Sequence, residues 1–168
     1  MIKFTKWFSV FIIANGISYL GFLISLAKPL QTPEEALQSF YTHDVAEDML
    51  MDPLVLAGKK VVPLVIKAVK NTEMPRRRYA IAFLGNDTYT TALPVLEEIL
   101  KDKTEKDYFR GDALLSIYKI DKKIGQKLAT KYKGSNNYLG KMCKEVFEDS
   151  SYANETRSYF DALRGWHE

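Results

Sequence analysis

Apolar residues recur at spacings of three and four along most of residues 33–163, a pattern that predicts amphipathic helices. No segment shows the strict alternation of a half-buried strand, and helix-breaking residues separate the apolar stripes. We therefore expect an all-α domain of about nine short helices with short connections. The clearest stripes are Val61, Val62, Val65, Ile66 and Val69; Ala92, Leu93, Leu96, Ile99 and Leu100; Ala113, Leu114, Ile117 and Tyr118; and Leu139, Met142, Cys143, Val146 and Phe147.

The first and last of these helices carry end signals. Thr32 suits an N-cap, Pro33 suits the first turn, and Glu35 lies three residues after the cap, which together predict a capping box. At the other end of the chain a helix is expected to cover the last apolar face. Its members at helical spacing are Ala153, Thr156, Tyr159, Phe160 and Leu163.

The helices also recur as pairs. Arg77-x-x-Ala80-x-x-x-Leu84 returns 33 residues later as Arg110-x-x-Ala113-x-x-x-Ile117, and Val62-Pro63-Leu64-Val65 returns 31 residues later as Leu93-Pro94-Val95-Leu96. A self-similar period in the low thirties is typical of α-solenoids.

The segments 75–86 and 92–100 resemble the HEAT-like repeat family, in its short bacterial membrane-anchored or exported form. In that family an Arg and a small Ala mark the first helix, Gly-Asn the turn, and Ala-Leu-Pro-x-Leu the second helix, as in Ala92-Leu-Pro-Val-Leu96 here. The resemblance covers about half of the chain, and residues 105–132 lack the proline, where Lys127 stands. It implies a solenoid of antiparallel helix pairs over residues 29–168, with capping helices at both ends, but no particular activity.

A separate uncharged segment of 21 residues runs from Trp7 to Ala27. As a helix it is long enough to cross the roughly 30 Å hydrocarbon core of a bilayer. Basic residues precede it and an acidic stretch follows it, so the positive-inside bias predicts a cytoplasmic N-terminus. We expect residues 1–28 to form a single-pass signal-anchor and residues 29–168 to lie outside the cytoplasm, in a periplasm. The alternative is a signal peptide cleaved after Ala27, which leaves a periplasmic or secreted domain.

Small residues form one face of this segment. Ala14, Ser18, Gly21 and Ser25 recur at spacings of four, three and four. Such a face lets a second transmembrane helix approach closely. It predicts a protein partner that is itself embedded in the membrane.

The sequence contains few groups suited to catalysis. Its two histidines, His43 and His167, lack further ligands at metal-binding spacing, and the single cysteine, Cys143, lies on an apolar stripe where a buried and inert thiol is expected. We expect no enzymatic activity, no catalytic residues, no metal and no cofactor.

Two basic features suit binding instead. Arg77 and Arg110 are expected to be structural, pairing with a turn carboxylate such as Asp87 or Asp121, whereas Arg76 and Arg78 are expected to face solvent and meet an acidic partner.

The second basic feature is the lysine-rich stretch 119–144. An extracytoplasmic location argues against nucleic acid and favours anionic lipid or wall polymer. The expected contacts are Lys122, Lys123, Lys127, Lys131 and Lys133. The sequence thus predicts a protein-binding adaptor or accessory subunit of a membrane complex, with an exported binder of anionic lipid surface or wall polymer as the alternative.

Overall fold

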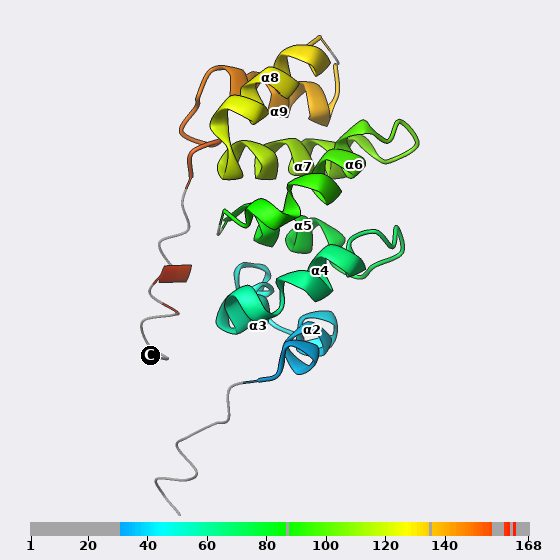
Figure 1. The fold of residues 1–168 in the computed structure, drawn as a ribbon, viewed down its shortest axis with the longest axis vertical. Helices are drawn as coiled ribbons and strands as arrows, with labels where there is room; N and C mark the ends of the chain where they lie inside the picture. Colours follow the sequence, from blue (N-terminus) through cyan, green and yellow to red (C-terminus); the bar gives the residue numbers. More distant parts are fainter. Residues whose placement is uncertain (1–30, 87, 135, 156–159, 162, 164–168) are drawn as a thin grey trace, which may run out of the picture. The chain divides into compact units, whose positions relative to one another are not determined.

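The computed structural model describes residues 31–86, 88–134, 136–155, 160, 161 and 163 (Figure 1). These residues belong to one compact unit, Gln31–Glu168. Within them the chain forms eight α-helices and no β-strand, which confirms the all-α class.

The helices keep the labels of Figure 1. Three short 3₁₀ turns lie between them: η1 (Glu47–Met49), η2 (Gly58–Lys60) and η3 (Thr90–Ala92). The α-helices are α2 (Pro33–Thr42), α3 (Asp52–Ala57), α4 (Val62–Ala68), α5 (Arg77–Asn86), α6 (Leu93–Lys101), α7 (Asp107–Ile120), α8 (Lys122–Tyr132) and α9 (Tyr138–Phe147).

Side-chain caps fix the starts of three helices. The predicted capping box of α2 is confirmed: Thr32 accepts a hydrogen bond from the Glu35 amide at 3.2 Å, and the Glu35 carboxylate accepts one from the Thr32 amide at 2.8 Å. Asp121 caps α8 by accepting from the Ile124 amide, and Asn137 caps α9 by accepting from the Gly140 amide. Each such cap stabilises its helix by about 1 kcal/mol.

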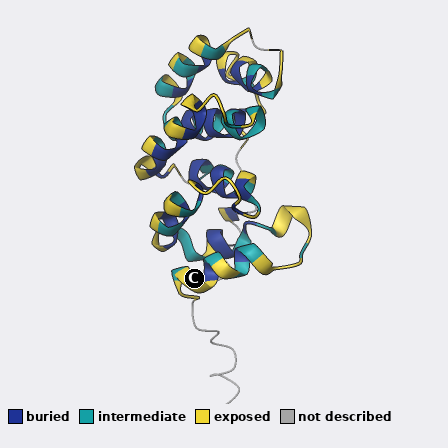
Figure 2. Cartoon of the chain, turned by 90° about the vertical axis from the view of Figure 1, so that its right-hand side faces the viewer, coloured by how far each residue is buried: buried dark blue, intermediate teal, exposed yellow. Residues whose placement is uncertain are grey.

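The predicted apolar stripes form the core. Most of their members are buried, and Figure 2 shows the buried positions turned toward neighbouring helices. Phe147 is the exception, because its side chain is 60% exposed at the end of α9. Its prediction as a core residue was wrong. Of the expected closing helix, Thr156 and Tyr159 lie outside the described residues, whereas Ala153, Phe160 and Leu163 are buried.

Helix α7 lies at the centre of the later helices. Helix α7 packs against α5, α6, α8 and α9, and α8 also packs against α9. At the other end α2 packs against α3 and α4, and α4 contacts α5 (Figure 1).

Two glycines allow close helix contacts. A Cβ atom added at Gly85 of α5 would lie 2.6 Å from the Ser116 Cα of α7, and one at Gly125 of α8 would lie 2.5 Å from the Tyr118 Cα. Both distances are shorter than any tolerable carbon contact, so a side chain at either position would push two helices apart.

Among the described residues, no helix is both long and apolar enough to cross a membrane. The segment from Trp7 to Ala27, with its predicted packing face of Ala14, Ser18, Gly21 and Ser25, lies outside those residues.

Candidate functional site

A groove of about 280 Å³ lies where α5, α7 and α9 meet. Helix α5 lines it with one face, and α7 contributes a second row of side chains. Residues of η1 and of the segment after α9 complete the wall. We call this the α5–α7–α9 groove, and its lining residues are Glu47, Arg78, Tyr79, Ala82, Asn86, Asp112, Leu115, Lys119, Tyr138, Tyr152 and Glu155.

The carboxylate of Asp112 lies at the centre of the groove's polar network. Arg78 donates to it from Nε at 2.6 Å and from Nη2 at 3.2 Å, and the Tyr138 hydroxyl donates to it at 2.8 Å. The Asp112 side chain is only 10% exposed, so its charge depends on these donors. One residue from each of three helices is thereby fixed in a single cluster.

The Arg78 guanidinium is held on its faces as well as at its edge. Its Cζ lies 5.5 Å from the Tyr108 ring centroid and 5.3 Å from the Tyr138 ring centroid, distances suited to cation–π attraction. The hydrogen bond to Asp112 raises the Arg78 pKa. Half of the Arg78 side chain is exposed, as expected, but its guanidinium already pairs with Asp112. Its contact with a partner stays a prediction.

Arg76 is also bound within the chain. Its Nη1 donates to the Phe40 carbonyl and its Nη2 to the His43 carbonyl, both at 2.6 Å. These carbonyls end α2, where the helix dipole favours a cation. Arg76 has a φ of 56°, an unfavourable backbone conformation for a non-glycine residue. The strained residue thus joins the end of α2 to the start of α5.

Arg77 and Arg110 have matching structural contacts. The Arg77 Nε donates to the Val69 carbonyl at 2.7 Å, and the Arg110 Nε donates to the Leu100 carbonyl at 3.0 Å. Each arginine thus joins the start of one helix to the end of the preceding one.

Arg77 pairs with a turn carboxylate, as expected, but that residue is Glu105 and not Asp121. Arg77 forms an ion pair with Glu105, and the two side chains are 3% and 7% exposed. Asp121 instead caps α8, where it accepts from the Ile124 amide. Asp87 lies outside the described residues.

The five predicted lysine contacts all lie on α8 or at its C-cap, Lys133. Lys122 is not freely available, because its Nζ lies 3.3 Å from the Asp149 carboxylate. Lys123, Lys127 and Lys131 are exposed. None of these lysines lines the α5–α7–α9 groove, so the predicted arginine and lysine contacts do not form one site.

The shifted pKa values around the groove move away from neutrality. Burial, followed by the charge of Asp112, raises the pKa of Tyr138. Cys143 is buried as predicted, and burial raises the pKa of its thiol to about 11. Neither group exchanges protons near pH 7. The described part of the chain holds no cluster of three or more His, Cys, Asp or Glu side chains suited to a metal.

The sequence reasoning did not identify most of the groove's lining. The signal that could have located it is the spacing between bonded residues. Arg78 bonds to Asp112 34 residues later, Lys119 contacts Asn86 33 residues earlier, and Tyr79 donates to Glu47 32 residues earlier. Complementary side chains about one repeat apart are therefore candidates for contacts between repeats.

The chain matches no family model, and comparisons with curated proteins and with solved structures found no match. The resemblance to HEAT-like repeats thus stays a prediction from the sequence.

Proposed function

We propose that this chain is a membrane-anchored, extracytoplasmic HEAT-like repeat protein that acts as a protein-binding adaptor or accessory subunit of a membrane complex. In this proposal residues 1–28 are the anchor, residues 29–168 form the solenoid, and the α5–α7–α9 groove binds a segment of the partner.

The separation of bonded residues supports the solenoid. Several long-range side-chain bonds span 31 to 36 residues, close to the sequence period, and a second group spans 26 to 28 residues. The repeated arginine contacts at Val69 and Leu100 support it further, because equivalent residues make equivalent bonds. Stacked repeats produce this regularity, since each one contacts mainly its neighbours.

The lining of the groove is the observation that carries the proposed binding role. Three tyrosines (Tyr79, Tyr138 and Tyr152) lie there with Arg78 and Leu115. Tyrosine and arginine are enriched at the energetic centres of protein interfaces. The bonds among Arg78, Asp112 and Tyr138 hold the surface in place before a partner arrives, which lowers the entropy cost of association.

The charges in the groove favour one kind of partner segment. Arg78 and Lys119 are balanced by Glu47, Asp112 and Glu155. A polyacid would meet repulsion as well as attraction there. A segment with aromatic or aliphatic side chains and a few polar groups fits better. The raised pKa of Tyr138 supports recognition rather than proton-transfer chemistry in the groove.

Photocrosslinking in native membranes tests the groove. Benzoylphenylalanine replaces Tyr152, which is 45% exposed at the groove, or Glu98, an exposed residue of α6 outside it. We expect one discrete adduct from position 152 and none from position 98. The adduct should be lost in Leu115→Glu, with folding checked by protection of the buried Cys143 thiol. Equal adducts at both positions, or an adduct that survives Leu115→Glu, would contradict the proposal.

The anchor needs its own test. We expect the mature protein to keep its original N-terminus and to resist alkaline extraction from membranes. The double change Ser18→Ile with Gly21→Ile should release it from a detergent-stable complex, because bulky side chains block close helix approach. A mature N-terminus at Lys28 would establish the cleaved alternative.

A further inference from the structure

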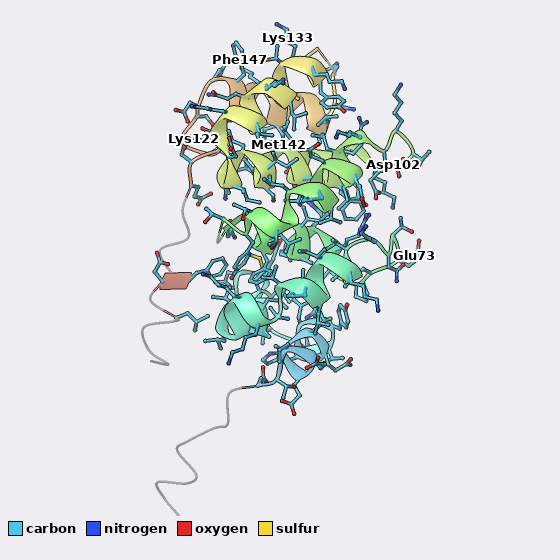
Figure 3. All side chains as sticks on the ribbon, viewed as in Figure 1. Glu73, Asp102, Lys122, Lys133, Met142 and Phe147 are labelled. Atoms are coloured by element: carbon cyan, nitrogen blue, oxygen red, sulfur yellow. The ribbon has the colours of Figure 1, made fainter. Side chains whose placement is uncertain are left out.

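The exposed Phe147 at the end of α9 has a basic neighbour. Its side chain is 60% exposed, more than the other large exposed apolar residues of the described chain, Met49, Leu56 and Tyr152. The Lys133 Nζ lies 6.0 Å from the centroid of the Phe147 ring. Figure 3 shows both residues at the same end of the described structure. An aromatic ring is thus held at the surface beneath an ammonium group.

Helix α8 carries further lysines on its solvent-facing side. Lys123, Lys127 and Lys131 recur every four residues and are exposed, whereas the opposite face of α8 buries Gly125 and Ala129. Lys122 at the start of α8 pairs with Asp149, two residues beyond Phe147, and Lys133 at the helix end reaches Phe147 itself. Both ends of α8 therefore reach the end of α9, so Phe147 lies beside α8.

Little acidic charge offsets these lysines. Helix α8 contains no Asp or Glu, and two of the three acids within two residues of Phe147, Glu148 and Asp149, already pair with Lys144 and Lys122. The third, Glu145, is half-buried. Within the described part of the chain, Lys123 and Lys127 have no ion-pair partner. The surface thus combines uncompensated positive charge with an exposed aromatic ring.

We propose that this surface, the α8–Phe147 face (Lys123, Lys127, Lys131, Lys133 and Phe147), docks on the surface of an anionic lipid bilayer. Lysines are attracted to anionic headgroups, and an exposed aromatic side chain at the edge of the lysine face enters the boundary between headgroups and acyl chains. A soluble polyanion satisfies the lysines but leaves the ring in water. The ring therefore favours a bilayer over a polymer. This inference is independent of the groove and its partner.

An environment-sensitive label at position 147 tests the docking. The full chain carrying Cys143→Ala and Phe147→Cys is labelled with nitrobenzoxadiazole and reconstituted into vesicles. One set contains phosphatidylcholine alone, and the other contains equal parts phosphatidylcholine and phosphatidylglycerol. We expect brighter, blue-shifted emission only in the anionic vesicles, and its loss in high salt because salt screens the attraction. A label at exposed Thr72 should not respond to the lipid.

Matched charge reversals separate a specific face from general basicity. Lys123, Lys127 and Lys131 are changed together to Glu, and the control changes three other exposed lysines, Lys59, Lys60 and Lys67. Each lysine near an anionic surface strengthens association about fivefold, so removing three lowers the docked-to-free ratio by on the order of a hundredfold. The control should keep the brighter, blue-shifted emission in anionic vesicles.

Four outcomes would overturn the proposal. The first is equal emission in both kinds of vesicle. The second is an equal loss of the emission change in the Lys123/Lys127/Lys131 variant and in the Lys59/Lys60/Lys67 control. The third is an equal response to polyglutamate without vesicles. The last is blue-shifted emission before lipid is added, which indicates that another part of the chain or a second copy covers position 147.

Discussion

The Arg77–Glu105 pair is the most deeply buried ion pair among the described residues. Arg77 also donates to the Val69 carbonyl and lies 4.7 Å from the Phe109 ring centroid. Removing two charges from water is costly, and their mutual attraction offsets that cost only while both are present. The loss of one member should therefore destabilise the fold by more than the intact pair stabilises it.

Arg77→Met should lower the free energy of unfolding by about 3–5 kcal/mol, because it leaves Glu105 charged and buried without its partner. Arg77→Met with Glu105→Leu should recover most of that loss. Arg110→Met is the matched control, since Arg110 donates to one carbonyl and is less buried, and it should cost about 1 kcal/mol. Urea unfolding of these three variants and of Glu105→Leu alone measures these values. Simple additivity of the Arg77 and Glu105 changes would contradict the buried-charge argument.

Asp149 makes the stability of the folded domain depend on pH in the acid range. Hydrogen bonds from Tyr118, Asn154 and Lys122 lower its pKa to about 2, whereas an aspartate in the unfolded chain titrates near about 3.9. A lowered folded-state pKa means that the stabilisation is fully present above about pH 4 and is lost as the pH falls toward about 2.

The difference in urea midpoint between the native chain and Asp149→Asn should stay constant from neutral pH to about pH 5 and narrow below about pH 4. Asparagine suits this position, because Asp149 has a φ of 50°. Since Asp149 is exposed, the difference should also shrink in high salt. A difference that widens in acid would contradict the assigned bonds.

Sequence reasoning succeeded at the residue scale where local spacing decides the outcome. Thr32 and Glu35 form the predicted box because both partners lie within one turn. It did not identify the contacts that Arg76 and Arg78 make within the chain. Arg76 precedes α5 with a φ of 56°, whereas Arg78 lies in the first turn of α5, so the two side chains meet different surroundings. The groups that receive them, the Phe40 carbonyl and the Asp112 carboxylate, are 36 and 34 residues away.

At the scale of elements, apolar periodicity predicted the longer helices and their buried faces. It did not predict α3, whose six residues are too few to establish a helical period. It also placed Phe147 in the core, because a continued spacing does not reveal whether a neighbouring helix covers the last turn. Apolar periodicity also could not predict the close contact of α8 with α7, since this contact depends on the absence of a side chain at Gly125.

Gly125→Ala should destabilise the domain by about 1–3 kcal/mol, although alanine is the better helix former by about 1 kcal/mol. The added methyl group would meet the Tyr118 backbone, which cannot move without shifting α7. Thr130→Ala, at an exposed position of the same helix, should be neutral or slightly stabilising. Thermal unfolding compares the two variants. A stabilising effect of Gly125→Ala would mean that α8 sits farther from α7.

At the scale of the whole described unit, the contacts divide unevenly. Helix α7 touches four other helices, whereas α2 packs mainly against α3 and α4. If helices contact only their nearest neighbours, a destabilising substitution should lower stability only in the helices that its own helix contacts. Sequence period alone predicts an array of such contacts, but it does not reveal which helix holds the most neighbours together.

Leu114→Ala and Phe40→Ala each remove a fully buried side chain and should cost about 2–5 kcal/mol locally. Hydrogen exchange should show which helices each substitution destabilises. Leu114→Ala should lower amide protection from α5 through α9 together, because α7 contacts all of these helices. Phe40→Ala should lower it in α2 to α4 and spare α7 to α9. Identical exchange patterns for both variants would indicate a single cooperative unit.

The lone cysteine has a consequence for the chemistry of the folded chain. Cys143 is 1% exposed in α9, and burial keeps its thiol protonated at neutral pH. A thiol exchanges disulfides only as an accessible thiolate. In an oxidising compartment the native protein should therefore neither dimerise through this residue nor accumulate mixed disulfides. Oxidative capture of Cys143 would instead mark those molecules in which α9 has separated from its neighbours.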